Sequence, residues 1–139
     1  MTLLDIGCGW GFLLIEAAKK YKIKGTGITL SHEQYGEFKK RIKEENLQDY
    51  LDVKLMDYRD LPKSGKTFNR VVSVGMVEHV GRENYQLFND CVSQVLNDGG
   101  IFLLHFISAL KEHPGDACIK KYIFPGGVVP SLREMLSAM

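Results

Sequence analysis

The stretch LLDIGCGWG, residues 3–11, contains the residues whose types and spacing are most typical of ligand chemistry. Gly7, Gly9 and Gly11 recur at every second position, and an acid, Asp5, stands two residues before the first of them. Glycine permits positive φ and lets the backbone approach a ligand closely. The apolar run that follows predicts a helix, and the first N–H groups of a helix suit an anionic or polar group. The pattern therefore predicts a loop for a nucleotide-type cofactor at the first crossover of an α/β sheet.

An NAD-dependent enzyme is an alternative that two features argue against. NAD loops are usually spaced G-x-G-x-x-G, and an acid at the end of the second strand binds the ribose hydroxyls. Here the spacing is G-x-G-x-G, and the second predicted strand runs into Thr29, Leu30 and Ser31, with Gln34 one helical turn later. The NAD interpretation is disfavoured on both counts.

Strand-like and helical segments alternate along the chain, and these elements must position the loop. Strands are expected at residues 3–6, 24–29, 52–57, 70–74 and 101–106, and helices at 12–20, 32–45, 83–97 and 131–139. Ser31 is a plausible N-cap with Gln34 at the capping-box position, and Asn97-Asp98-Gly99-Gly100 is expected to end the third helix. The alternation predicts one α/β domain over residues 1–139, with a doubly wound, mostly parallel sheet and right-handed crossovers.

The composition excludes several function classes. The net charge of +1 gives no basis for a broad electrostatic interaction with nucleic acid. Cys8, Cys91 and Cys118 are odd in number and lack metal-ligand spacing, so we expect no disulfide, no metal site and a reducing, cytoplasmic location. No apolar run approaches the roughly 20 residues of a membrane span, and no signal peptide is visible. Because the first predicted strand starts almost at residue 1, we expect the chain to be part of a longer protein.

The regular alternation stops after His105. Residues 107–130 contain three prolines and the pair Gly126-Gly127, and a connection this long is usually a functional loop. It leaves the carboxyl end of a strand, where open α/β sheets place their ligands. The fifth strand is expected to be an edge strand, which native proteins rarely leave bare.

Six motifs, taken in order, resemble the cyclopropane-fatty-acyl-phospholipid synthase family, which includes the mycolic acid cyclopropane synthases. They are DIGCGWG, GITLSHEQ, MDYRDL, RVVSVGMVEHVG, GIFLLHFI and KYIFPGG, and they cover residues 2 to about 136. The family uses S-adenosylmethionine (SAM). The resemblance implies a Rossmann-like class I SAM methyltransferase core of five strands in the order 3-2-1-4-5, without the family's final strands.

The resemblance also implies which residues bind SAM, and they follow the ends of the first four strands. The methionine part of SAM would be wrapped by Gly7, Cys8, Gly9 and Gly11, and Asp5 would support this loop. The ribose would be bound by Thr29, Leu30 and Gln34, and the adenine by Asp57 and Tyr58. Val74 would contact the cofactor through its own backbone. Turn geometry alone could explain the glycines, and Gln34 could serve only as a helix cap. Cys8 is expected to be a small packed residue, because no base for a nucleophile is apparent nearby.

The family reaction adds the SAM methyl group to a cis double bond of a phospholipid acyl chain, and a bound bicarbonate removes a proton from the added methyl group before the ring closes. The resemblance implies that Glu78, His105 and the backbone of Ile107 hold the bicarbonate. A glutamate can accept the O–H proton of that anion and a histidine can donate to it. His79 is interpreted as structural. Tyr122, Phe124 and Pro125 are expected either to wall the acyl pocket or to anchor a packed loop.

Family members carry further segments on both sides of this region, one with a cysteine and one with a tyrosine that also contact the bicarbonate. We therefore expect this chain to bind SAM weakly and to have little or no synthase activity. Membrane contact in the full-length enzyme and a homodimer through the bare fifth strand are hypotheses. Two alternatives stay open: a SAM-dependent N-methyltransferase of a small amine, and a non-catalytic SAM-binding module.

Overall fold

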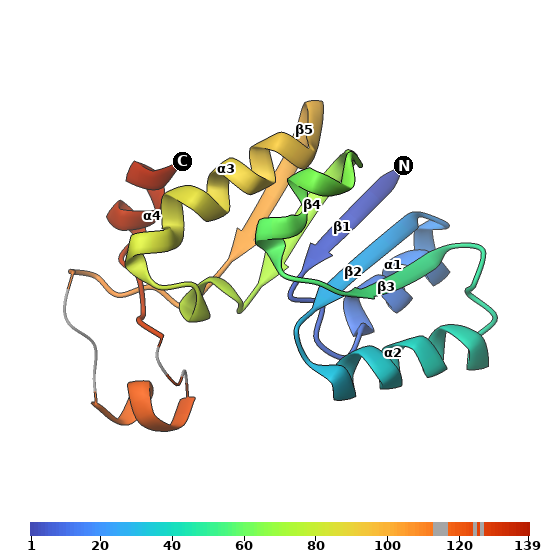
Figure 1. Ribbon diagram of the computed structural model, residues 1–139, viewed down its shortest axis with the longest axis horizontal. Helices are drawn as coiled ribbons and strands as arrows, with labels where there is room; N and C mark the ends of the chain where they lie inside the picture. Colours follow the sequence, from blue (N-terminus) through green and yellow to red (C-terminus); the bar gives the residue numbers. More distant parts are fainter. Residues whose placement is uncertain (113–116, 124, 126) are drawn as a thin grey trace.

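The computed structural model describes residues 1–112, 117–123, 125 and 127–139, and its centre is a five-stranded sheet (Figure 1). The strand order is β3-β2-β1-β4-β5 and every neighbouring pair is parallel. The strands are β1 Thr2–Ile6, β2 Lys24–Thr29, β3 Leu51–Leu55, β4 Phe68–Val74 and β5 Leu96–His105, and the helices are α1 Phe12–Tyr21, α2 His32–Glu44, α3 Tyr85–Val95 and α4 Leu132–Ala138. The predicted fold class and strand order are confirmed.

Helices cover the two faces of the sheet on either side of β1. The residues of β1 alternate between the faces: Leu4 and Ile6 pack into the core formed with α3 and α4, whereas Leu3 packs with the core of α1 and α2. The strand order reverses direction at β1, so right-handed crossovers place α1 and α2 on one face and α3 on the other. The carboxyl end of β1 therefore lies at the topological switch point, where such sheets bind ligands.

Several predicted boundaries were wrong by a few residues, and the turns explain why. β3 ends at Leu55, so Asp57 belongs to the turn after it. Residues 82–84 form a 3₁₀ turn, and α3 begins only at Tyr85. The α3 helix ends at Val95, before the Asn97–Gly100 run that was expected to stop it. That run lies within β5 as an irregularity, since β5 carries three more residues than β4 between the pairs Phe68–Leu96 and Arg70–Ile101.

The fifth strand is covered on one face only. Phe102, Leu104 and Phe106 pack against the core beside α3, but Ile101 and Leu103 are each 56% exposed on the opposite face. Within the described residues, no helix combines the length and the apolar character that crossing a bilayer requires.

Candidate functional site

The turn after β1 is built on glycines with left-handed backbone. The φ angles of Gly7, Gly9 and Gly11 are 79°, 55° and 82°. The backbone N–H groups of Gly7 and Cys8 both donate to the carbonyl of Ile28, at 3.0 Å each, which fixes the turn against the end of β2. Gly11 then becomes the N-cap of α1. The turn thus joins the carboxyl ends of the two central strands to a helix N-terminus.

The three glycines meet different surroundings. A Cβ atom on Gly11 would lie 2.1 Å from Cδ2 of Phe38, and one on Gly7 would lie 2.6 Å from Cγ of Met76. A Cβ atom on Gly9 would meet no atom within 4 Å. Packing therefore requires glycine at 7 and 11, whereas the backbone of Gly9 faces open space.

A cavity of about 580 Å³ lies in front of this turn, in the size range of small-molecule sites. Its walls come from the carboxyl ends of the first four strands and the turns that follow them. They comprise Ile6, Gly7 and Gly9; Ile28, Thr29, Leu30, Ser31 and Gln34; Met56 and Tyr58; and Val74, Gly75, Met76 and His79. The turn after β4 thus faces the turns after β1 and β2 across one cavity.

The predicted cofactor residues divide into two groups around this cavity. Those that line it are Gly7, Gly9, Thr29, Leu30, Gln34, Tyr58 and Val74, whereas Asp5, Cys8, Gly11 and Asp57 do not. Sequence reasoning did not single out Met56, Gly75 or Met76 as lining residues, and it gave His79 a structural place. Their position directly after β3 and β4 was the signal that could have identified them.

Gln34 is held by a short polar chain. The Ser31 hydroxyl accepts from the backbone N–H of Gln34 at 3.2 Å, as expected of the N-cap. In this described part of the chain Gln34 does not complete a capping box with Ser31, because the Gln34 Oε1 atom accepts from the Thr29 hydroxyl at 2.9 Å. Thr29 also accepts from the backbone of Ser31 at 3.1 Å. The Gln34 side chain is thereby oriented at the cavity wall.

Asp5 and Cys8 are buried behind the cavity wall. Asp5 is 3% exposed and lies between Gly27 and Val72 on the neighbouring strands, and this burial raises the pKa of its carboxyl group to about 7. Burial, and then the charge of Asp5, raise the pKa of the Cys8 thiol to about 12. A thiol that stays protonated is a poor nucleophile, and Cys8 packs in the core of α1 and α2.

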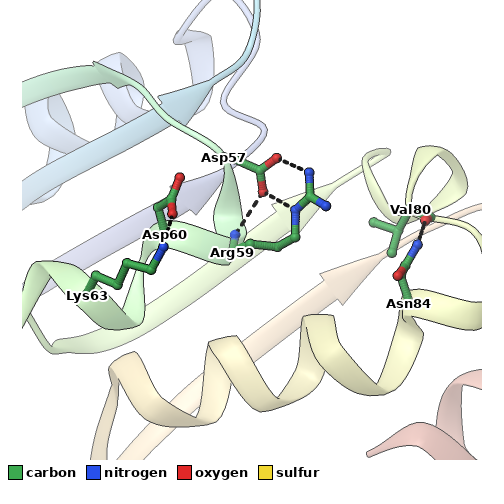
Figure 2. A network of polar contacts seen from close by, with 6 residues as sticks. All are labelled: Asp57, Arg59, Asp60, Lys63, Val80 and Asn84. Carbon is green, nitrogen blue, oxygen red and sulfur yellow. Dashed lines mark hydrogen bonds and ion pairs between the residues drawn. The ribbon is translucent and has the colours of Figure 1, made fainter.

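Asp57 is engaged by its neighbour Arg59, as Figure 2 shows. Its Oδ1 atom accepts from the backbone N–H of Arg59 at 2.9 Å and from Nε at 3.0 Å, and Oδ2 accepts from Nη2 at 2.7 Å. The hydrogen bond from the guanidinium is the main cause that lowers the pKa of Asp57. Tyr58 instead lines the cavity and packs edge-on against Phe88, with ring centroids 5.2 Å apart.

Glu78 occupies the 3₁₀ turn Val77–His79 after β4 and is completely buried. Its Oε1 atom accepts from the backbone N–H of Ile107 at 2.7 Å, and its carbonyl accepts from the N–H of Val128 at 3.1 Å. Its Oε2 atom is buried and has no hydrogen-bond partner within the described part of the chain. One residue therefore fastens the start and the end of the long segment that follows β5.

The remaining predicted catalytic and substrate residues lie apart from the cavity. His105 ends β5 opposite Val74, its side chain is exposed, and its carbonyl accepts from the N–H of Gly75 at 2.9 Å. Tyr122 lies in the π-helix Ile119–Ile123 and is 69% exposed. Phe124 lies outside the described residues. The structure thus brings Glu78 and the Ile107 backbone together, and His105 to the same edge of the sheet.

The family resemblance implies two bound groups, SAM and bicarbonate, and the described residues fit SAM better than bicarbonate. For SAM, the cavity has a suitable volume, and its wall includes glycine backbone at Gly9 and Gly75 with open space beside it. For bicarbonate, the unpartnered Oε2 atom of Glu78 suits an O–H donor, but the Ile107 amide already donates to Glu78. Within the described residues, no cluster of His, Cys, Asp and Glu is arranged to hold a metal ion.

Comparisons with known proteins point to one family. The family model described as mycolic acid cyclopropane synthetase matches residues 1–139. The chain is 44% identical to a cyclopropane-fatty-acyl-phospholipid synthase of Escherichia coli, over 97% of this chain and 34% of that protein. A solved mycolic acid cyclopropane synthase complexed with SAH and CTAB superimposes with a TM-score of 0.87 at 30% identity, over 99% of this chain and 52% of the other.

A second group of enzymes shares this fold. Coclaurine N-methyltransferase bound to N-methylheliamine and SAH superimposes with a TM-score of 0.84 at 28% identity, over 99% of this chain and 42% of the other. The chain spans about a third of the length of its curated relatives from Pseudomonas putida and Escherichia coli.

Proposed function

The chain belongs to the mycolic acid cyclopropane synthetase family, and on that basis we propose that it binds SAM and serves methyl transfer to a cis double bond of a phospholipid acyl chain. The observation that carries the proposal is the cavity at the switch point of the sheet. Its walls come from four strand ends and include seven of the residues that the family resemblance assigns to SAM, namely Gly7, Gly9, Thr29, Leu30, Gln34, Tyr58 and Val74.

We propose that these residues bind different parts of the cofactor. The backbone of Gly7 and Gly9, beside the N-terminus of α1, would hold the amino-acid part. Gln34, oriented by Thr29, would hold the ribose, and Tyr58 would cover the adenine. Asp57 could accept from the adenine amine only in addition to its bonds with Arg59. When bound, SAM supplies an electrophilic methyl group.

We propose that Glu78 holds the bicarbonate that removes a proton from the added methyl group. The Oε2 atom is buried without a partner, and leaving such an atom unpaired costs about 1–3 kcal/mol or more for a charged group. A bicarbonate whose O–H donates to this atom would relieve that cost, with His105 as a second donor from the adjacent strand end. The deprotonation of the added methyl group by such an anion is part of the proposal.

The substrate and partners follow from the relatives. The E. coli relative is named for phospholipid substrates, so a phospholipid acyl chain and peripheral membrane contact in the full-length enzyme belong to the proposal. Tyr122 and Phe124 are proposed to wall the acyl pocket. A homodimer would pair the exposed edge of β5 with a second copy, and light scattering that finds only monomer at high concentration would contradict it. The cytoplasmic location inferred from the cysteines stays a prediction.

Calorimetric titration with SAM tests the first part of the proposal. We expect SAM to bind to the 139-residue chain. A Gln34→Ala variant should bind SAM about tenfold more weakly, because it loses an uncharged hydrogen bond to the ribose worth about 1 kcal/mol or slightly more. Gln94→Ala, on the exposed side of α3, is the matched control and should bind as the parent does. Absence of binding of both SAM and SAH to the folded chain would contradict the proposal.

Product analysis tests the second part. The chain is incubated with SAM, bicarbonate and vesicles of unsaturated phospholipid, and the acyl chains are examined by mass spectrometry for an added CH₂ unit. We expect slow turnover at most, and none in Glu78→Gln. Methylation of a soluble amine without a lipid product would favour the N-methyltransferase alternative, which the resemblance to coclaurine N-methyltransferase supports. SAM binding with neither product would favour a binding module.

A further inference from the structure

His79 lines the cavity, and the proposed reaction gives this residue no role. It is the last residue of the 3₁₀ turn Val77–His79, and successive residues of such a helix point about 120° apart. Glu78 is turned into the core toward the Ile107 amide. His79 is exposed and lines the cavity together with Met76 from the same turn. The turn thus places His79, and not Glu78, at the wall of the cavity.

The charges around the cavity make this imidazole important. Apart from His79 and Tyr58, the residues that line the cavity have apolar or uncharged polar side chains or are glycines, and burial raises the pKa of Tyr58 above its ordinary value. Asp57 lies behind the wall and is paired with Arg59. Asp5 lies behind the turn of β1. Histidine is the side chain whose charge ordinarily changes between pH 5 and 8.

We propose that His79 contacts the cofactor and sets the preference of the cavity between SAM and its demethylated product, S-adenosylhomocysteine (SAH), through its charge. The inference rests on the proposed SAM binding. SAM has a positive sulfonium where SAH has a neutral thioether, and the two are otherwise the same. A protonated imidazole in the wall repels the sulfonium and leaves the thioether unaffected, whereas a neutral imidazole does not repel either. Acid therefore favours retention of the product, and a rise in pH favours the methyl donor.

The ratio of two dissociation constants isolates this effect. Both ligands carry the same adenosine and amino-acid groups, and at pH 7.0 and below the amino group of each is protonated and the carboxyl group ionised, so these groups cancel in the ratio Kd(SAM)/Kd(SAH). Calorimetry at pH 5.5 and 7.0 should show the ratio falling about threefold in the parent chain, as expected for one like charge at a partly exposed site. In His79→Gln the ratio should be the same at both pH values. In His79→Lys it should stay at the acid value at pH 7.0.

Two control variants separate His79 from other titrating groups. His32→Gln changes an exposed histidine at the start of α2 that is not part of the cavity wall, and it should keep the parent's pH dependence. Asp5→Asn removes the buried carboxyl whose pKa is raised to about 7, and it should keep the dependence as well. A pH-dependent ratio that persists in His79→Gln, or a parent ratio that does not change with pH, would overturn the inference while SAM binding stands. Failure of both ligands to bind the folded parent would overturn the proposed function and the inference with it.

Discussion

Replacement of Gly11 by alanine tests how the turn after β1 is built. Gly11 has φ of 82° and caps α1. The new methyl group would lie 2.1 Å from Cδ2 and 2.3 Å from Cε2 of Phe38. Phe38 is fully buried in the core of α1 and α2, so its ring can move only if that core is repacked.

Two costs add in this variant. An alanine in the left-handed region is disfavoured by about 1–2 kcal/mol, and an extra methyl group in a packed core typically costs about 1–3 kcal/mol. We therefore expect Gly11→Ala to lower the free energy of unfolding by about 2–5 kcal/mol. For a domain of this size that corresponds to a fall in Tm of roughly 6–15 °C.

Urea and thermal unfolding followed by circular dichroism measure this change, and two other glycines calibrate it. Gly9→Ala has a similar positive φ of 55° but no atom within 4 Å, so it should cost about 1 kcal/mol and mainly weaken SAM binding. Gly36→Ala, inside α2 with open space around it, should stabilise the chain by about 0.5–1 kcal/mol. Equal stability of the Gly11→Ala and Gly9→Ala variants would refute the argument from Phe38.

Three further predictions concern titrating and paired groups. Because the pKa of Asp5 is raised from 3.8 to about 7 in the folded chain, the native state holds a proton that the unfolded state has released, so stability falls as pH rises from about 4 to 7; urea unfolding of Asp5→Asn should lack that fall, and an unchanged slope would contradict the assignment. Glu134 of α4 pairs with Arg82 and accepts from the backbone N–H of Ser131 at 2.7 Å. Glu134→Ala should therefore lower the urea midpoint by the equivalent of about 1–3 kcal/mol, and Glu134→Gln by less because its amide oxygen still accepts. Iodoacetamide at pH 8 should modify the exposed Cys118 before the buried Cys8, and mass spectrometry showing the reverse order would refute the burial argument.

The fold could be predicted from the sequence because its signals are local and repeated. Segments with strand-like and helical patterns alternate along the chain, and three glycines indicate the turn after β1. Boundaries failed where a short turn intervened. Asp57 reads as the end of a strand, but its carboxylate accepts from the Arg59 backbone and starts a 3₁₀ turn instead. Residues 97–100 read as a helix stop, but α3 ends earlier and they become an irregularity of β5.

The motifs predicted which residues belong to the site, but they did not predict which of these residues contact one another. Thr29 and Gln34 are five residues apart, and their hydrogen bond follows from the Ser31 cap that joins them. The bond between Glu78 and the Ile107 amide joins residues 29 positions apart, and only the pairing of β4 with β5 brings them together. Nothing local distinguishes His79, which lines the cavity, from Glu78, which does not, because a 3₁₀ turn follows neither the strand nor the α-helical period.

The central position of β1 has a consequence for how the molecule assembles. Its near neighbour β2 follows after one helix, but its other neighbour β4 is far along the chain, and Thr2 and Asn69 exchange hydrogen bonds across 67 positions. Closing so long a loop is entropically costly, so we expect β1, β2 and β3 to pair before β4 docks. The cavity takes residues from the turn after β4, and it therefore exists only once docking is complete. In a refolding experiment, capture of a fluorescent SAH analogue should lag behind the recovery of helical circular dichroism, and simultaneous recovery would contradict this order. The ability to bind a ligand would then be the last property that the refolding chain acquires.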